Sequence, residues 1–530
     1  MSLRLCRIAE RFSCRAFLFL GLTLVACSES FSQQITCPVA SEFVNSGVTS
    51  NSLNPCVIQS GVTFINQTDA NFTNTQGATL VNNSGATLTL QNGSAVVNNG
   101  TFTSDGRIND AGQLFNGGTP SGGTLNNGGT IAIAGNGTLL NGGSLTAVTL
   151  NNGPAGTITN FGQLTNGLFG ALNSAGTIFN GGTLTNDSGT ITNFGGAIDN
   201  SGTFSGSTGI LNNDGTVTNF VGATYTNGLL YNNGTFTNSG MFDSSDGNVI
   251  NSGTLENRGN LFSVLLTNNS GGAILNDAGA VLTTFGTFTN NSGAAILNAA
   301  GATLNISGTL TNAGTITNIG NIAQYGVLDI QAGGVLNNLR GSTFSQNAGQ
   351  TIVDGTLNSV PTVQIVLGIL SGTGTINGSV NNSVGTVQPG DALGTLAING
   401  NFTQGSRGTL LIDLGGSGPG EFSVLDVSGL ATLDGTLDFT AVDGFTPVAG
   451  DDFTFLLFGS NSGDFSSIDF TNWACPVNDT CTDVLGPNSL SLEIKGPTTA
   501  TPEPSSLFLL GMALLALGVC SRRKRASAIA

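Results

Sequence analysis

The chain has 530 residues, of which 8% are charged, 39% are hydrophobic and none is histidine. Disordered chains combine low hydrophobicity with high charge, so this composition argues against disorder, and the 80 glycines favour a repetitive β structure. The net charge is −17, and nucleic-acid binding, which needs Lys and Arg to displace counterions from phosphates, is excluded. Between its two basic ends the chain contains five basic residues: Arg107, Arg258, Arg340, Arg407 and Lys495.

Residues 1–32 have the parts of a secretion signal. Four arginines precede an apolar run of 11 residues, from 16 to 26, which is too short to span a bilayer but suits a signal peptide. Two processing sites remain open. Cleavage after Ser32 would make Gln33 the N-terminus, whereas the lipobox-like sequence that ends at Cys27 would make that cysteine a lipidated N-terminus.

Residues 33–60 are expected to form an N-terminal cap that carries a disulfide. The cysteines of the exported body occur as two local pairs, Cys37 with Cys56 and Cys475 with Cys481. In an oxidising compartment each pair would close a loop at one end of the body. A zinc site built from all four thiols is the alternative, but the two pairs are far apart in sequence.

Residues 61–360 contain a glycine-punctuated repeat. Between residues 176 and 240 the glycines take ten steps over 64 residues, about 6.4 residues each. Segments such as Thr190–Asn193 (TITN) and Thr216–Asn219 (TVTN) stand between them, and their alternation of Thr with an apolar residue is typical of a short strand with one buried face. Three steps give a coil of about 19 residues, so the repeat predicts an all-β, right-handed parallel β-helix of roughly 16 coils.

The asparagines that end these segments are expected to turn the chain together with the glycines that follow, because both residues tolerate positive φ. Equivalent asparagines of stacked coils would also lie above one another and form a hydrogen-bonded amide ladder, which satisfies their buried polar groups. The pattern resembles the β-helices of filamentous-haemagglutinin-like proteins and of autotransporter passenger domains.

Residues 361–495 resemble the last coils of an autotransporter passenger domain, followed by a cap. The resemblance is carried by Gly-Thr-Gly at 372–374, Pro-Gly-Asp at 389–391, Phe-Thr-Gln at 402–404 and Asp-Val-Ser-Gly at 426–429. The resemblance implies the fold of these residues but not the secretion route of an autotransporter, since a sorting tail follows them where an autotransporter has its outer-membrane barrel. Aromatic residues between 453 and 473 are interpreted as a cap over the open end of the β-helix, with a sugar-binding platform as the alternative.

Residues 496–530 contain a proline-rich segment, an apolar run and a basic cluster. Pro502, Glu503 and Pro504 come first, residues 505–520 are apolar, and the basic cluster then consists of Arg522, Arg523, Lys524 and Arg525. The prolines keep the first segment out of a helix, and the positive-inside rule holds the basic cluster in the cytoplasm. A transmembrane sorting helix is therefore expected.

This order of elements resembles the PEP-CTERM sorting signal of Gram-negative bacteria. The resemblance implies export through the secretion machinery, recognition by a membrane-embedded exosortase and transient anchoring in the inner membrane by the C-terminal helix. It also implies a final location at the cell surface, at the outer membrane or in the extracellular matrix, and an association with exopolysaccharide, other surface proteins and biofilm.

The preferred function is that of a non-enzymatic surface or matrix protein for adhesion or biofilm structure. The absence of histidine removes the commonest general base, and no catalytic residue, metal site or cofactor is expected. The densest acid pairs, Asp451 with Asp452 and Asp243 with Asp246, are interpreted as turn residues. Two alternatives stay open: a β-helical polysaccharide lyase or hydrolase, and a glycosylated passive surface carrier.

Overall fold

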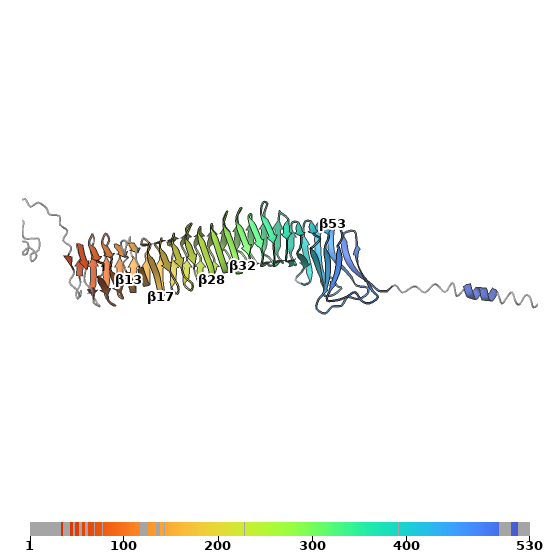
Figure 1. The fold of residues 1–530 in the computed structure, drawn as a ribbon, viewed down its shortest axis with the longest axis horizontal. Coiled ribbons are helices and arrows are strands. Elements are labelled where there is room, and N and C mark those ends of the chain that lie inside the picture. The colour runs from red at the N-terminus through yellow and green to blue at the C-terminus, as the bar shows by residue number, and fades with distance from the viewer. Residues whose placement is uncertain are drawn as a thin grey trace, which may run out of the picture.

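The computed structural model describes residues 33–34, 43–45, 48–51, 56–58, 62–67, 69–76, 78–116, 124–133, 138–141, 144–226, 228–390, 392–497 and 510–517. The predicted secretion signal, with Cys27, lies outside the described residues. Figure 1 shows the body as a long rod in which short strands stack one coil upon the next. The strands form three long parallel ladders, which are called faces I, II and III.

Face I consists of β2 (Phe43–Asn45), β5 (Thr63–Asn66), β8 (Thr87–Leu90), β11 (Arg107–Asp110), β20 (Thr190–Asn193), β23 (Ile210–Asn213), β26 (Leu229–Asn232), β35 (Thr309–Asn312), β38 (Val327–Ile330), β41 (Gln350–Val353), β44 (Ile369–Gly372), β47 (Thr386–Pro389), β50 (Thr409–Leu414), β52 (Thr436–Ala441) and β54 (Ser467–Thr471). Face II consists of β1 (Gln33–Gln34), β3 (Val48–Asn51), β6 (Asn71–Asn74), β9 (Ala95–Asn98), β12 (Gln113–Asn116), β14 (Thr138–Asn141), β16 (Thr157–Asn160), β18 (Thr177–Asn180), β21 (Ala197–Asn200), β24 (Thr216–Asn219), β27 (Thr235–Asn238), β29 (Thr254–Asn257), β31 (Ala273–Asn276), β33 (Ala295–Asn298), β36 (Thr315–Asn318), β39 (Val335–Asn338), β42 (Thr356–Ser359), β45 (Thr375–Asn377) and β48 (Gly394–Ile398).

Face III consists of β4 (Cys56–Ile58), β7 (Thr79–Asn82), β10 (Thr101–Ser104), β19 (Thr183–Thr185), β22 (Thr203–Ser205), β25 (Thr224–Thr226), β34 (Thr303–Ile306), β37 (Asn321–Gln324), β40 (Thr343–Gln346), β43 (Val363–Ile365), β46 (Val380–Asn382) and β49 (Phe402–Gln404). Longer strands bend at a corner and belong to two faces: β13 (Thr124–Ile133), β15 (Ser144–Asn152), β17 (Gln163–Ser174), β28 (Met241–Asn251), β30 (Asn260–Asn268), β32 (Val281–Asn290), β51 (Ser423–Leu433) and β53 (Asp452–Gly463).

The register confirms a parallel β-solenoid. In the described part of the chain the ladders before β56 are all parallel; on face I, for example, Thr190 pairs with Ile210 and Ile210 with Leu229. Fourteen such steps carry face I from Thr63 to Gln350, so the mean coil has about 20 residues, slightly more than the expected 19. The steps vary because the corners differ in length.

The four-residue strands whose side chains are described bury their second and fourth residues. In β24, Val217 and Asn219 are fully buried, whereas Thr216 and Thr218 point outward. Alternating side chains of a strand lie on opposite faces of a sheet, so this four-residue pattern gives the rod an apolar interior bordered by rows of buried amides. The alternation predicted from the sequence is confirmed.

The asparagine ladder is also confirmed. On face II, thirteen hydrogen bonds of 2.7–2.9 Å join the Nδ2 of one asparagine to the Oδ1 of the next, one coil further on. The ladder consists of Asn74, Asn98, Asn116, Asn141, Asn160, Asn180, Asn200, Asn219, Asn238, Asn257, Asn276, Asn298, Asn318 and Asn338. Each buried amide thus finds partners in the neighbouring coils, which removes the cost of burying it alone.

The glycines serve a different purpose from the one expected. Of the eleven glycines in the series from 176 to 240, Gly195 and Gly222 have positive φ. At Gly202 a Cβ would collide with the carbonyl oxygen of Gly182, and at Gly234 with that of Gly215. Among the described residues, the asparagines with positive φ are Asn472 and Asn478, outside the repeat. Most corner glycines are therefore needed for the close approach of stacked backbones, so the positive-φ explanation was wrong for most of them.

The C-terminal end of the rod is closed by antiparallel strands. After β54, the chain forms β55 (Thr480–Leu485) and β56 (Ser489–Lys495), and β56 pairs antiparallel with both β53 and β55. A disulfide joins Cys475, in the segment before β55, to Cys481 of β55. Cys56 is buried and disulfide-bonded, while Cys37, its expected partner, lies outside the described residues.

The aromatic residues near this end pack into the core. Phe453 and Phe455 have no exposed surface. The indole ring of Trp473 packs edge-on against Phe470 at 4.8 Å, and its Nε1 donates a hydrogen bond to the carbonyl oxygen of Phe439 at 3.2 Å. Rings held in this way cover the last coils, which supports the interpretation as a cap over that of a sugar-binding platform.

Candidate functional site

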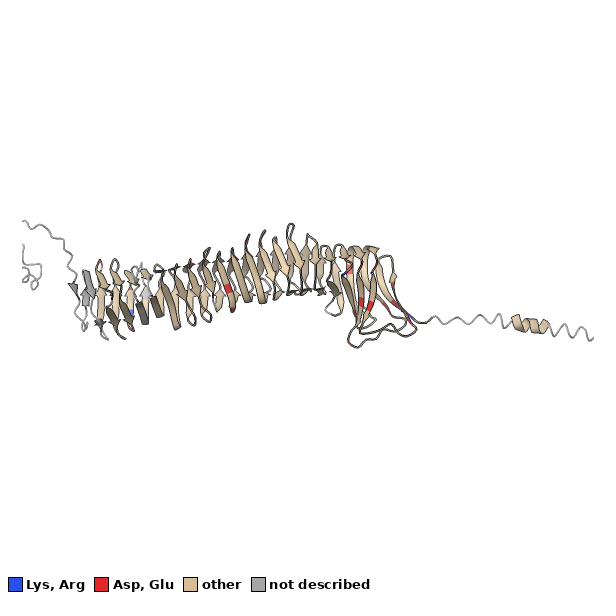
Figure 2. Ribbon diagram, viewed as in Figure 1, with Lys and Arg blue, Asp and Glu red and all other residues tan. Residues whose placement is uncertain are grey.

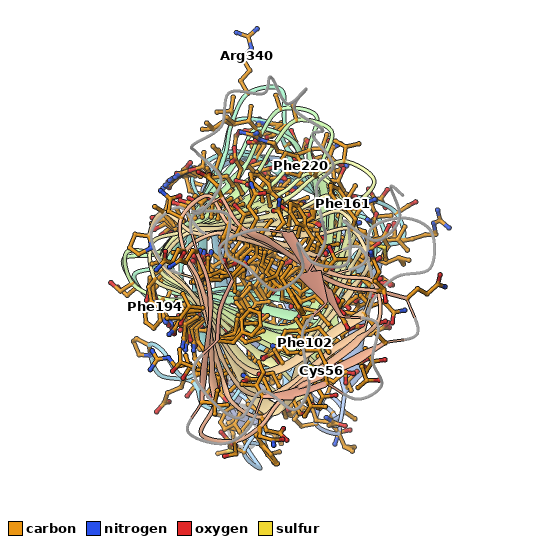
Figure 3. The ribbon with its side chains drawn as sticks, turned by 90° about the vertical axis from the view of Figure 1, so that its left-hand side faces the viewer. Cys56, Phe102, Phe161, Phe194, Phe220 and Arg340 are labelled. Carbon is orange, nitrogen blue, oxygen red and sulfur yellow. A yellow bond between two sulfur atoms is a disulfide. The ribbon has the colours of Figure 1, made fainter. Side chains whose placement is uncertain are left out.

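The outer surface of the rod is polar and carries few charges. Figure 2 shows charged residues scattered sparsely along the rod, with acidic residues among the last coils. The view along the rod in Figure 3 places Phe102 among the interior side chains, while Phe161, Phe194 and Phe220 lie near its rim. These three rings are 67%, 58% and 44% exposed, so single aromatic residues interrupt an otherwise hydroxyl-rich and amide-rich surface.

One carboxylate of each acid pair named from the sequence accepts a hydrogen bond from the backbone. The Oδ2 of Asp451 accepts a hydrogen bond from the backbone of Val448, and the Oδ1 of Asp243 accepts one from the backbone of Ser245. Both carboxylates thus hold turns. Among the described residues, no group of three or more Cys, Asp or Glu side chains is placed to hold a metal ion.

Two carboxyl groups are buried: Asp110 and Asp413. Burial raises the pKa of Asp110 to about 7, partly offset by the hydrogen bond that its Oδ1 accepts from the backbone of Gly112 at 2.9 Å. Burial also raises the pKa of Asp413, while a hydrogen bond of 2.8 Å from the Nε2 of Gln388 lowers it. Neither group is accessible to a large substrate, and the sequence pattern marked neither of them.

A hollow lies on face II beside the cap. Within the repeat the corner between faces I and II is short, with two residues between Asn213 and Thr216, for example. After β50 the corner instead forms a loop, residues 415–421, closed by an antiparallel bridge between Leu414 and Phe422. The hollow between this loop and the last strands of face II has a volume of about 580 Å³.

The floor of this hollow consists of outward side chains from three strands. Thr395 of β48, Val424 and Asp426 of β51, and Leu457 of β53 lie along it, and Pro419 of the loop forms part of the wall. The register fixes their order, because Thr395 pairs with Val424 and Asp426 pairs with Leu457. An apolar centre with hydroxyl and carboxylate groups around it is typical of a ligand pocket.

A second carboxylate stands at the far end of the same hollow. Asp452 precedes Leu457 by five residues on β53, and Leu457 lies opposite Asp426. At 3.3 Å per residue, the Cα atoms of Asp452 and Asp426 are about 16 Å apart along the strand direction. Glycoside hydrolysis uses paired carboxylates about 5–10 Å apart, which is closer than this backbone spacing.

The C-terminal tail contains the other candidate site. Residues 510–517 form a short helix, which is the described part of the apolar run 505–520. No helix among the described residues has the length and apolarity of a membrane span. The residues named for the sorting signal, Pro502 to Pro504 and Arg522 to Arg525, lie outside the described residues.

Residues 500–524 match the family model for the PEP-CTERM protein-sorting motif. The tail is a PEP-CTERM sorting motif. The match includes the Pro-Glu-Pro segment, the apolar run and most of the basic cluster, in the order set out from the sequence. No curated protein matches the chain.

A PEP-CTERM signal implies an exported, cell-surface protein that is processed by an exosortase. The resemblance stated from the sequence is thereby confirmed: the chain joins a PEP-CTERM tail to a parallel β-solenoid. The solenoid contributes the exposed surface, and the PEP-CTERM motif determines where that surface is presented.

Proposed function

We propose that this protein is a non-enzymatic surface or matrix protein whose rod binds extracellular polysaccharide and promotes adhesion within a biofilm. The observation that carries the proposal is the combination of a PEP-CTERM tail with a rod whose strands turn hydroxyl and amide side chains outward. Such side chains both donate and accept hydrogen bonds, as sugar hydroxyls do.

The repetition of the rod supports the same function. Strands of neighbouring coils are about 4.8 Å apart, so outward groups recur at a constant interval along the rod. A linear polymer can meet many such groups at once, and weak contacts then add up to firm attachment. The spacing of acidic residues supports binding over catalysis, since Asp426 and Asp452 in the hollow beside the 415–421 loop stand about 16 Å apart along the strand direction, farther than the carboxylates of glycoside hydrolysis.

The proposal is tested in the host bacterium with four strains: wild type, a deletion, Pro502→Ala/Pro504→Ala and the control Pro497→Ala, whose substitution lies outside the sorting motif. We expect the deletion and the double variant to attach less biofilm and to retain less polysaccharide at the surface. The control should behave as wild type. The measurements are attached biomass, bound polysaccharide and the amount of the protein at the cell surface.

Equal attachment in all four strains would contradict the adhesive function, whatever the location of the protein.

The enzymatic alternative is distinguished from the adhesive function by incubating the purified protein with neutral and acidic polysaccharides. We expect no release of reducing ends or unsaturated products. Turnover that persists through purification and disappears in Asp426→Asn or Asp452→Asn would overturn the non-enzymatic assignment.

A further inference from the structure

We propose that the hollow beside the 415–421 loop is a binding site for a short stretch of an uncharged polysaccharide. This inference rests on the proposed function and names the place on the rod where the sugar chain is held. β53, which supplies part of the floor, is labelled near the C-terminal end of the rod in Figure 1. The site therefore lies at the end from which the sorting tail continues.

The shape of the hollow suits a sugar chain. Its volume of about 580 Å³ falls within the range of small-molecule pockets, and it extends about 16 Å from Asp426 to Asp452. It is elongated along the strand direction, so it can take several sugar rings in a row.

A pyranose ring has C–H groups on its faces and hydroxyl groups around its edge, and the lining of the hollow offers partners for both. Val424 and Leu457, the latter 37% exposed, form an apolar floor on which the C–H groups of a ring can lie. Thr395 offers a hydroxyl group, and the Asp426 carboxylate can accept hydrogen bonds from sugar hydroxyls. Hydrogen bonds to a charged acceptor are the stronger ones, so Asp426 is expected to contribute more affinity than Thr395.

The charge of the site selects against acidic polymers. Its lining includes Asp426 and Asp452 but no Lys or Arg, and the chain carries a net charge of −17. A uronic-acid polymer would bring further negative charge next to two carboxylates. The ligand class that fits is therefore a neutral hexose or N-acetylhexosamine polymer.

The wall of the site is held in place before any ligand arrives. Within the loop, the backbone N–H of Gly415 donates to the carbonyl oxygen of Glu421 at 2.9 Å, and that of Gly418 donates to the Oε2 of Glu421 at 2.9 Å. The backbone N–H of Glu421 in turn donates to the carbonyl oxygen of Gly418 at 3.0 Å. A wall fixed by three hydrogen bonds loses little freedom on binding, which favours affinity.

The test is isothermal titration of the purified full-length chain with four probes. Cellohexaose and chitohexaose represent uncharged polymers, hexagalacturonate represents acidic ones, and a peptide of residues 497–502 represents an extended polypeptide. We expect one or both uncharged oligosaccharides to bind, and hexagalacturonate to bind at least about tenfold more weakly. Binding of the peptide with no binding of either uncharged oligosaccharide would overturn the proposal.

Two variants locate the binding on the rod. Thr395→Trp fills the floor and should abolish binding, and Asp426→Asn should weaken it by about tenfold. The matched controls are Ala197→Trp and Asp199→Asn, which change outward residues of face II in the middle of the rod. All four variants should keep the circular dichroism spectrum of the wild type, because each changes an outward side chain.

The outcomes of these experiments distinguish a failure of the proposed binding site from a failure of the adhesive function. If an uncharged oligosaccharide binds the wild type and both site variants equally, the hollow is not the site, although the adhesive function stands. If no uncharged oligosaccharide binds while the deletion strain still attaches less biofilm, the sugar specificity is overturned and the adhesive role is not. Loss of binding in Thr395→Trp, with retention in Ala197→Trp, supports the proposal.

Discussion

Asp110 occupies a position at which the neighbouring coils carry apolar residues. On face I it stacks between Leu90 and Ile133, and its Oδ2 has no hydrogen-bond partner. Its pKa is raised to about 7 from 3.8, so between these values the folded chain keeps a proton that the unfolded chain releases. The free energy of unfolding therefore falls as the pH rises from about 4 to about 7. Below about pH 4 the carboxyl group is protonated in both states and the full stability is present.

Asp110→Asn should therefore stabilise the rod at pH 8, by on the order of 4 kcal/mol, and should have little effect at pH 4. An asparagine has an acceptor within reach, as Asn193 shows on the same face by donating to the carbonyl oxygen of Thr216 at 3.2 Å. The measurement is the urea-unfolding midpoint at both pH values. Asp105→Asn, which removes an exposed carboxyl group, is the control; an equal shift in the control would refute the explanation by burial.

Sequence reasoning at the residue scale succeeded where a residue type has one dominant use. Buried asparagines such as Asn219 were foreseen, because an amide inside a coil needs a partner and the repeat supplies an identical one. The purpose of Gly202 was not foreseen, because its requirement comes from the carbonyl oxygen of Gly182 in the previous coil. Asp110 was missed as well, since only the stacking register shows that its neighbours are Leu90 and Ile133.

At the scale of the element, the face II ladder connects coils through side chains as well as backbone. Asn219 accepts a hydrogen bond from the Nδ2 of Asn200 at 2.7 Å and donates to the Oδ1 of Asn238 at 2.8 Å. It also donates to the carbonyl oxygen of Met241 at 3.0 Å. Removing this one amide thus leaves buried polar groups without partners in the coils above and below.

Asn219→Ala should destabilise the rod by roughly 3 kcal/mol, because unpaired buried groups cost about 1–3 kcal/mol each. Thr218→Ala, in the same strand but facing outward, should change stability by less than about 0.5 kcal/mol. Chemical denaturation of both variants measures the difference. Similar losses in the two variants would show that the strand as a whole, and not the amide ladder, determines the effect.

The hollow beside the 415–421 loop is also formed by neighbouring elements, and it was not predicted from the sequence. Its wall depends on a long corner, and its floor on strands of three different coils, so the hollow appears only when Thr395, Val424 and Leu457 are placed by register. The aromatic run from Phe453 drew attention as a possible platform, yet its rings turn inward to the core. The outward residues between them line the hollow instead.

At the scale of the whole molecule, the chain separates two tasks. The PEP-CTERM tail is a short sorting signal that could be recognised from the sequence alone, because its three parts occur in linear order. The rod depends on stacking, in which each coil contacts mainly its two neighbours. Stability in such a molecule is approximately the sum of coil and interface contributions, so its length can change without loss of the fold.

Removal of one complete coil should therefore be tolerated. Deleting residues 197–215 joins Gly196 to Thr216, which already occupies the register position of Ala197, and would bring Asn219 under Asn180 in the amide ladder. We expect a strand-rich circular dichroism spectrum and a cooperative melt within about 5 °C of the wild type. Deleting residues 197–206 removes about half a coil, displaces face I strands onto face II and should abolish cooperative melting. Equal tolerance of both deletions would contradict the idea that stacking register holds the rod together.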